Sequence, residues 1–249
     1  MCILRGHVKA AMIAFASLVP GGVYAGDHEA FSANVSLTTE YSYRGISQTD
    51  KRPAIQGGFD YKHAGGAYAG AWASSISWLR DAERGTNVSS GNSAEIDVYA
   101  GYAGKARHFD FDVGLLQYYY PGNFNSRWRQ AAGLKNPGTL EAYAGVSWKF
   151  VSLKYSRALS NLFGSPESRG SDYIDLSISY KARDDLSLDA HYGHQHVKGP
   201  GESYADWKLG ATYSMGGFDI GLHYVNTTIR HASSVNADGR GILSIKKSF

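Results

Sequence analysis

Residues 31–44 read Phe-Ser-Ala-Asn-Val-Ser-Leu-Thr-Thr-Glu-Tyr-Ser-Tyr-Arg, a strict alternation of mostly apolar with mostly polar side chains. Successive side chains of a β-strand point to opposite faces, so this stretch predicts a strand with one apolar and one polar face. It is longer than the usual strand of a soluble sandwich, and similar segments recur as far as Phe249. A transmembrane β-barrel is the fold class that this pattern favours.

About twelve such segments follow one another, each close to the ten residues that a tilted membrane strand requires. Their centres lie near residues 38, 58, 72, 99, 114, 145, 155, 177, 191, 209, 222 and 245. Tight links near residues 64–66, 105–107, 150–151, 183–185 and 215–217 alternate with long polar links at 80–92, 121–138, 160–171 and 229–239. The spacing predicts an all-β, closed antiparallel barrel with short periplasmic turns and longer extracellular loops.

The apolar face of each segment is expected to face the lipid. In the third segment that face reads Tyr68, Trp72, Ile76 and Trp78. Aromatic residues near strand ends suit the interfacial girdles of membrane barrels. The candidates for these girdles are Trp78, Tyr118, Tyr119, Tyr120, Trp148, Phe150, Tyr155 and Tyr180.

The first 25 residues have the pattern of a secretory signal peptide. Arg5, His7 and Lys9 precede an apolar run over residues 10–19, and small residues lead up to a cleavage site after Ala25. We therefore expect a cleaved segment 1–25 and a single barrel domain over 26–249. The only cysteine, Cys2, would leave with that segment, which argues against a disulfide, a lipid-anchored cysteine or thiol catalysis.

Composition excludes several other classes of protein. The formal net charge is only +3, which gives no indication of nucleic-acid binding. Mean hydropathy is -0.32, and no apolar run after residue 25 reaches the length of a membrane-spanning helix. A barrel hides its apolar residues in alternate positions, so low mean hydropathy is consistent with that fold.

Charged residues of both signs occupy the face opposite the apolar one. At membrane depth such charges are tolerable only where they meet water or one another. They are expected to line a water-filled, weakly ion-selective pore, whereas a plugged lumen of mutually neutralised charges is the alternative. The pore-lining candidates are Glu40, Arg44, Asp60, Lys62, Glu95, Asp97, Asp110, Asp112, Glu141, Lys154, Asp175, Asp189, His191, Asp206, Lys208, Asp219 and His223.

The sequence offers no metal, cofactor or catalytic site. His191, His194 and His196 lie close together, but alternation sends His191 inward and the other two outward, so we expect no metal site there. The only His-x-Ser spacing, His231-Ala-Ser233, lies in an expected loop, and no nucleophile-elbow, zinc-protease or phosphate-loop motif occurs. The protein is therefore not expected to be an enzyme, with an outer-membrane lipid hydrolase as the remaining catalytic alternative.

Several motifs together resemble the TorF-type porin family of proteobacteria, over most of the chain from Phe31 to about Tyr224. They are Tyr41-Ser-Tyr-Arg-Gly-Ile-Ser-Gln-Thr49, residues 53–58, Gly65-Gly-Ala-Tyr-Ala-Gly-Ala-Trp72, Asp97-Val-Tyr-Ala-Gly101, Tyr118-Tyr-Tyr-Pro-Gly122 and Glu141-Ala-Tyr-Ala-Gly145. The resemblance implies an outer-membrane barrel of Gram-negative bacteria. It supplies no catalytic or binding residues, so function has to be argued from the lumen.

The expected function is therefore an outer-membrane channel for passive diffusion of small polar solutes or ions. Expected partners are outer-membrane lipid, such solutes and the barrel-assembly machinery, which would read the C-terminal Phe249; a homo-oligomer stays open. The alternative is a non-conducting barrel that serves as an anchor or surface-binding protein. It is suggested by Phe124, Arg127, Trp128 and Arg129 in the longest loop.

Overall fold

The computed structural model describes residues 30–229 and 236–249. The expected signal peptide and the His231-Ala-Ser233 spacing lie outside these residues. The helices and strands are β1 (Ala30–Thr38), β2 (Ser42–Tyr43), β3 (Ile46–Ser47), β4 (Ala54–Lys62), β5 (Ala67–Ser75), α1 (Trp78–Ala82), β6 (Ala94–Ala106), β7 (Phe109–Tyr119), α2 (Ser126–Ala132), β8 (Thr139–Trp148), β9 (Val151–Ala158), the 3-10 turn η1 (Leu162–Gly164), β10 (Asp172–Arg183), β11 (Leu186–His196), β12 (Tyr204–Met215), β13 (Phe218–Thr227) and β14 (Arg240–Ser248).

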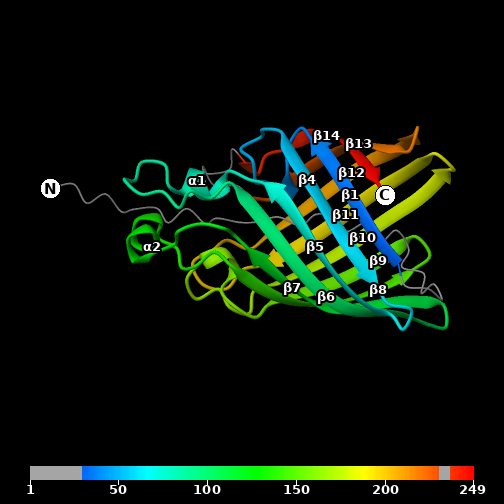
Figure 1. Ribbon diagram of the computed structural model, residues 1–249, viewed down its shortest axis with the longest axis horizontal. Helices are drawn as coiled ribbons and strands as arrows, with labels where there is room; N and C mark the ends of the chain where they lie inside the picture. The colour runs from blue at the N-terminus through cyan, green and yellow to red at the C-terminus, as the bar shows by residue number, and fades with distance from the viewer. Residues whose placement is uncertain (1–29, 230–235) are drawn as a thin grey trace.

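Twelve of these strands, β1 and β4 to β14, form one closed antiparallel barrel, and β2 pairs only with β3 (Figure 1). The barrel closes at β1, where Ser36 lies opposite both Gln56 of β4 and Lys246 of β14. The last residue continues the ladder, since the Phe249 and Ala33 backbones bond to each other at 2.9 and 3.2 Å. Every barrel strand thus has two neighbours, which removes the exposed edges of an open sheet.

The predicted strand count and the alternation of short and long connections are confirmed. Tight turns join strands at the end of the barrel that carries the C terminus, which we call the inner end (Figure 1). Gly216 and Gly217 form one of these turns with φ of 60° and 76°, a conformation that glycine adopts without strain. The long connections, with α1 and α2, project from the opposite end, which we call the outer end.

The first predicted strand is too long. β1 ends at Thr38, and residues 39–53 turn into the barrel as a segment that contains β2 and β3; we call it the lumen hairpin. Tyr41 and Tyr43 were expected on the apolar outer face, but they are 3% and 1% exposed inside the barrel. Alternation continues through the break, so the pattern alone could not show that the chain leaves the wall.

The face assigned to the third predicted strand is also wrong. Even-numbered residues of β5 point inward, which places Tyr68 and Trp72 in the lumen, and the outer face consists of the alanines at 67, 69, 71 and 73. The Tyr68 hydroxyl donates to Asp112 at 2.5 Å, so this aromatic ring has a polar partner inside. The prediction from hydrophobicity was wrong here because the larger apolar side chains of β5 fill the lumen and do not face outward.

Most residues on the other outward faces are apolar, as alternation predicts. Leu37, Val98, Leu115, Leu209 and Leu222 are each half or more exposed on the barrel surface. Of the expected girdle residues, Tyr119, Trp148, Phe150, Tyr155 and Tyr180 are exposed. Trp78, Tyr118 and Tyr120 are instead buried inside, so the prediction of a girdle role for these three is wrong.

The outer end is capped by its own connections. Trp78 and Leu79 of α1, Trp128 of α2 and Phe163 of η1 are nearly fully buried in one cluster with the lumen hairpin. The Nε1 of Trp128 donates to Glu83 at 2.7 Å and joins the two capping segments. Within the described residues, no helix has the length and apolarity needed to cross a bilayer.

Candidate channel lumen

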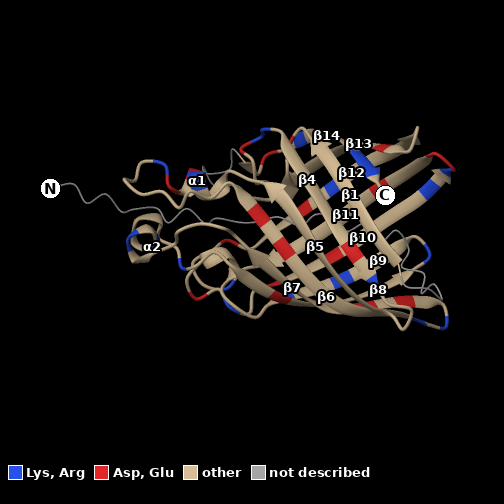
Figure 2. Ribbon diagram, in the orientation of Figure 1, with Lys and Arg blue, Asp and Glu red and all other residues tan. Residues whose placement is uncertain are grey.

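Charged residues of both signs occur along the barrel strands, not only at the strand ends (Figure 2). Because inward residues recur with a period of two, each predicted strand residue lies on the lumen side. These residues are Asp60, Lys62, Glu95, Asp97, Asp110, Asp112, Glu141, Lys154, Asp175, Asp189, His191, Asp206, Lys208, Asp219 and His223. Glu40 and Arg44 also lie inside, but the lumen hairpin supplies them rather than a strand.

Arg44 fixes the tip of the lumen hairpin across the outer half of the barrel. Its Nη2 lies 3.0 Å from Oε2 of Glu141 on β8, and Nη1 donates to Gln195 on β11. Its guanidinium also covers the ring of Tyr173 on β10 at 4.2 Å. The side chains of Arg44 and Glu141 are 1% and 2% exposed, so this buried pair excludes solvent at that level.

The backbone of the hairpin tip fits equally closely. Arg44 and Gly45 have φ of 42° and 80°, the left-handed conformation that reverses the chain between β2 and β3. A side chain at Gly45 would collide with Asp206 of β12 and Thr227 of β13. The tip therefore lies directly against β12 and β13. On the other side of the hairpin, Tyr43 packs edge-on against Tyr118 of β7.

Two further polar contacts hold the hairpin to the wall. Tyr41 donates from its hydroxyl to Glu95 at 2.7 Å, and Tyr120 reaches the other oxygen of the same carboxylate at 2.6 Å. On the opposite side of the hairpin, Glu40 pairs with Arg240 of β14, whose Nη1 also donates to the Gly45 carbonyl at 3.0 Å. The hairpin is thus anchored to β6, β8, β11 and β14, which closes most of the outer half.

At mid-depth the lumen contains a histidine bracketed by carboxylates. His191 lies 2.5 Å from Asp175 through Nδ1 and 2.7 Å from Asp206 through Nε2. Tyr173 donates to the second oxygen of Asp206 at 2.9 Å. With a carboxylate on each ring nitrogen, this geometry suits the doubly protonated imidazolium. These contacts join β10, β11 and β12 directly beneath the Arg44 guanidinium.

On the facing wall, tyrosines engage the carboxylates. Tyr68 bonds both Asp112 and Tyr143, and Tyr99 donates to Asp60 at 2.6 Å. Lys154 lies over the Tyr143 ring, 3.9 Å from its centroid. Toward the inner end, side chains such as Asp60, Lys62, Asp110, Asp219 and Lys246 are only half-buried. The inner half is therefore a polar space that contacts solvent, in contrast to the packed outer half.

Sequence reasoning missed the interior tyrosines, Gln195 and Arg240. The signal was present as spacing: Tyr99 follows Asp97 by two residues, Tyr143 follows Glu141, and Tyr173 precedes Asp175. Residues two apart on a strand share a face, so each acid marked an inward tyrosine. Arg240 had no comparable marker, because its partner Glu40 lies on the hairpin.

The three clustered histidines do not converge. His191 points inward, while His194 and His196 are exposed on the outer face of β11, and His196 lies 3.2 Å from Asp172. Among the residues that the structure describes, no group of three or more His, Cys, Asp or Glu side chains could hold a metal ion.

The model of one bacterial family matches residues 24–249, nearly the whole chain. The protein belongs to the Gcw_chp family. That family is described as bacterial proteins of unknown function. A comparison with curated proteins gives no match. Membership in Gcw_chp therefore defines the relatives of the chain without assigning an activity.

Solved structures show the same barrel at low sequence identity. The KdgM porin superposes with a TM-score of 0.55 at 11% identity, covering 88% of this chain and 99% of that one. The COG4313 outer membrane channel from Pseudomonas putida F1 gives 0.53 at 15% identity, covering 92% and 99%. The NanC porin gives 0.51 at 11%, covering 87% and 98%. This Gcw_chp protein thus has the fold of outer-membrane porin barrels.

Proposed function

We propose that this Gcw_chp protein is a porin-like channel of the bacterial outer membrane that passes small polar solutes or ions by passive diffusion, with weak selectivity. One observation carries the proposal: a closed barrel with an apolar exterior encloses charges of both signs. Leu37 and Leu222 are 58% and 62% exposed outside, whereas the charged residues of the strands face the lumen. Such an exterior suits lipid, and such an interior suits water and ions.

The lumen hairpin limits the proposed channel to low conductance. Passage through the outer half has to follow the margin of the Arg44, Glu141 and Gln195 cluster, where little solvent reaches. Acids and bases alternate around the inner half, so neither sign of ion gains a strong preference. The same packing is the specific observation that favours the alternative, a non-conducting barrel that serves as an anchor or surface-binding protein.

The proposal carries further expectations on assembly and partners. Residues 1–25 serve as the export signal, outer-membrane lipid surrounds the barrel, and the assembly machinery reads Phe249, which is 73% exposed at the end of β14. The resemblance of the sequence motifs, among them Tyr41 to Thr49, to those of TorF-type porins supports the same location.

The proposed channel has no catalytic role and no cofactor. The likeness of the fold to outer-membrane porin barrels supports the first of these expectations. The Ser233→Ala variant tests the catalytic alternative directly: we expect the purified protein and the variant to be equally inert toward phospholipid vesicles. Lipid hydrolysis that disappears in the variant would contradict this.

Single-channel recording of refolded residues 26–249 in a planar bilayer tests the function. The channel proposal predicts small, stepwise openings with a reversal potential near zero in a salt gradient. Protein that is shown to be folded and inserted but stays electrically silent would overturn the proposal in favour of the non-conducting barrel.

A further inference from the structure

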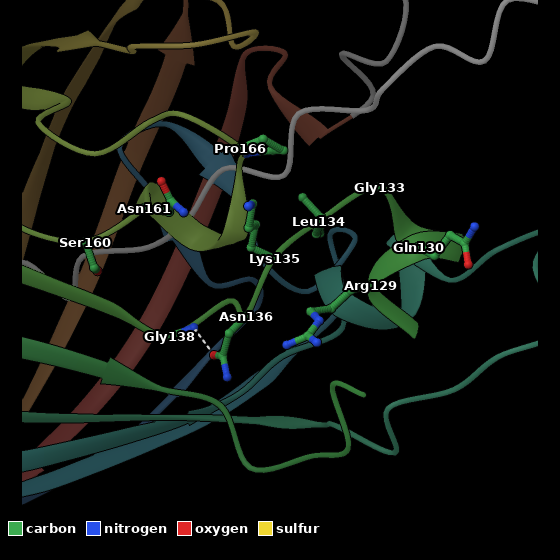
Figure 3. A pocket seen from close by; sticks show the side chains of 10 residues that line it. All are labelled: Arg129, Gln130, Gly133, Leu134, Lys135, Asn136, Gly138, Ser160, Asn161 and Pro166. Atoms are coloured by element: carbon green, nitrogen blue, oxygen red, sulfur yellow. Dashed lines mark hydrogen bonds between the residues drawn. The ribbon is translucent and has the colours of Figure 1, made fainter. Parts of the chain in front are cut away.

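A hollow of about 720 Å³ lies at the outer end, between the α2–β8 connection and the β9–β10 loop (Figure 3). Its polar lining comes from Arg129, Gln130, Lys135, Asn136, Ser160 and Asn161. The volume falls within the range of small-molecule sites. None of its ten lining residues belongs to a barrel strand or to the Arg44 cluster.

The loops that form the hollow are held in place from behind. The Lys135 backbone donates to the Gly164 carbonyl at 2.7 Å, which ties the α2–β8 connection to η1. Leu134 is 4% exposed and packs into the cap cluster. Pro166 closes one side of the hollow. These contacts give the polar lining a preformed backbone.

Two hydrogen-bond acceptors of the lining, on Asn136 and Ser160, are used by the protein itself. Asn136 Oδ1 accepts from the Gly138 backbone at 2.9 Å, shown dashed in Figure 3, which leaves its amide NH2 as a donor. Ser160 Oγ accepts from the Leu140 backbone at 2.9 Å and keeps its hydroxyl proton. Donor groups at these two positions therefore remain for a ligand, beside the complete side-chain amides of Gln130 and Asn161.

The hollow also carries two cations. Arg129 and Lys135 are exposed, and neither forms an ion pair within the described part of the chain. The ten lining residues include no Asp or Glu. A guanidinium, an ammonium and amide donors around one concavity are the chemistry that recognises carboxylate and phosphate oxygens.

We propose that this hollow binds an anionic group, a carboxylate or phosphate, carried either by a small hydroxylated solute or by a lipid headgroup. The guanidinium of Arg129 and the ammonium of Lys135 neutralise the anion, and the amides of Asn136 and Asn161 bond its neighbouring hydroxyl groups. The inference goes beyond the channel function and does not depend on conduction, because the lining residues come from α2 and the outer connections and not from the barrel strands.

Calorimetric titration of the folded protein in zwitterionic detergent tests the site, with inorganic phosphate and glucuronate as probes and glucose as the neutral comparison. Wild type is expected to bind both anions saturably and more weakly at high salt. The Arg129→Gln/Lys135→Gln double variant is expected to lose at least about tenfold in affinity, the scale of losing charge-assisted hydrogen bonds. Absence of saturable binding by wild type would overturn the proposal.

Arg127→Gln provides the matched control, since Arg127 is exposed on the same helix but does not line the hollow. It is expected to bind the anions as wild type does. Equal weakening in Arg127→Gln and in the double variant would reduce the effect to general surface charge and overturn the site.

A second arm separates the two sources of the anion. Protein is reconstituted in phosphatidylcholine vesicles with or without phosphatidic acid, and its thermal stability is compared with that of the double variant. Stabilisation by phosphatidic acid in wild type alone identifies a lipid headgroup, and equal stability with retained phosphate binding identifies a soluble anion. If the wild-type protein neither binds phosphate nor is stabilised by phosphatidic acid, the proposal is contradicted.

Discussion

The outer and inner halves of the lumen are enclosed by the same twelve strands, yet they are filled differently. In the outer half, Arg44, Glu141 and Gln195 are each 5% exposed or less, and the lumen hairpin occupies the space. In the inner half, Asp60, Lys62 and other charged side chains stay half-buried and no segment of the described chain enters. The strands that enclose the two halves are the same, and the inserted hairpin, together with the cap that packs on it, makes the outer half distinct.

Alternation in the sequence therefore predicts the strands of the barrel wall, but it does not predict which segment fills the space inside. Strand periodicity predicts inward-facing acidic residues in both halves alike. The space of the outer half is occupied by a fifteen-residue connection whose buried polar groups find partners on four strands. Buried polar networks of this kind are stable only when nearly every member is paired.

Thiol accessibility should show the largest difference between the halves. Ser152 and Ser156 both point into the lumen from β9, but Ser152 is half-buried in the inner half and Ser156 is 2% exposed in the outer half. In protein without Cys2, Ser152→Cys is expected to react with a charged thiol reagent on the order of a hundredfold faster than Ser156→Cys, since the latter requires local opening. Equal rates would contradict the difference in solvent access between the two halves.

Removal of the hairpin anchor should cost substantial stability. Arg44→Ala leaves Glu141 buried without its cation, and breaking such a pair typically costs about 3–5 kcal/mol. Unfolding in urea, followed by tryptophan fluorescence, measures the loss. Arg52→Ala is the matched control from the same segment: its side chain is 58% exposed beside Asp50, and exposed pairs contribute about 0–1 kcal/mol. Similar losses in both variants would show that the hairpin tip is not an anchor.

The cap over the outer half should loosen in acid. Burial acts to raise the pKa of Glu83, but hydrogen bonds from Ser90 and Trp128 outweigh it and hold that pKa below its ordinary value of 4.5. The carboxylate therefore contributes stability above the unfolded pKa, and the contribution is lost as pH falls through the folded pKa. Trp128 fluorescence should change in that window in wild type and much less in Glu83→Gln. Glu167→Gln, an exposed outer-loop control, should follow wild type.

The smallest effect concerns ion preference in the inner half. Asp219→Asn removes one half-buried lumen carboxylate whose neighbour Ser214 donates to it at 2.6 Å. Because opposite charges and solvent screen a single site, the cation-to-anion permeability ratio should fall by less than about twofold. Reversal potentials in a salt gradient measure the change, with the turn variant Asp184→Asn as the control. A reversal of selectivity would show that one residue governs the lumen.

Much of the wall could be predicted from sequence. Twelve period-two segments, the alternation of link lengths and the inward acids such as Asp112 and Asp175 follow from elementary strand geometry. The hairpin could not be predicted, because Tyr41 and Tyr43 keep the same alternation after the chain leaves the wall. The predicted orientation of β5 was wrong because Tyr68 and Trp72 fill the lumen. Alanines, which carry little hydrophobic signal, cover the outside of this strand.

The most direct measurement replaces the lumen hairpin and compares conductance. Thr38 and Ala54 lie opposite each other in the β1–β4 ladder, so a short Gly-Ser link can close the gap left by residues 39–53. Single-channel recording of this variant beside wild type in the same bilayer is expected to give a several-fold larger conductance step. Equal conductance from the two folded proteins would contradict the account, since the lumen hairpin would then not limit passage through the barrel.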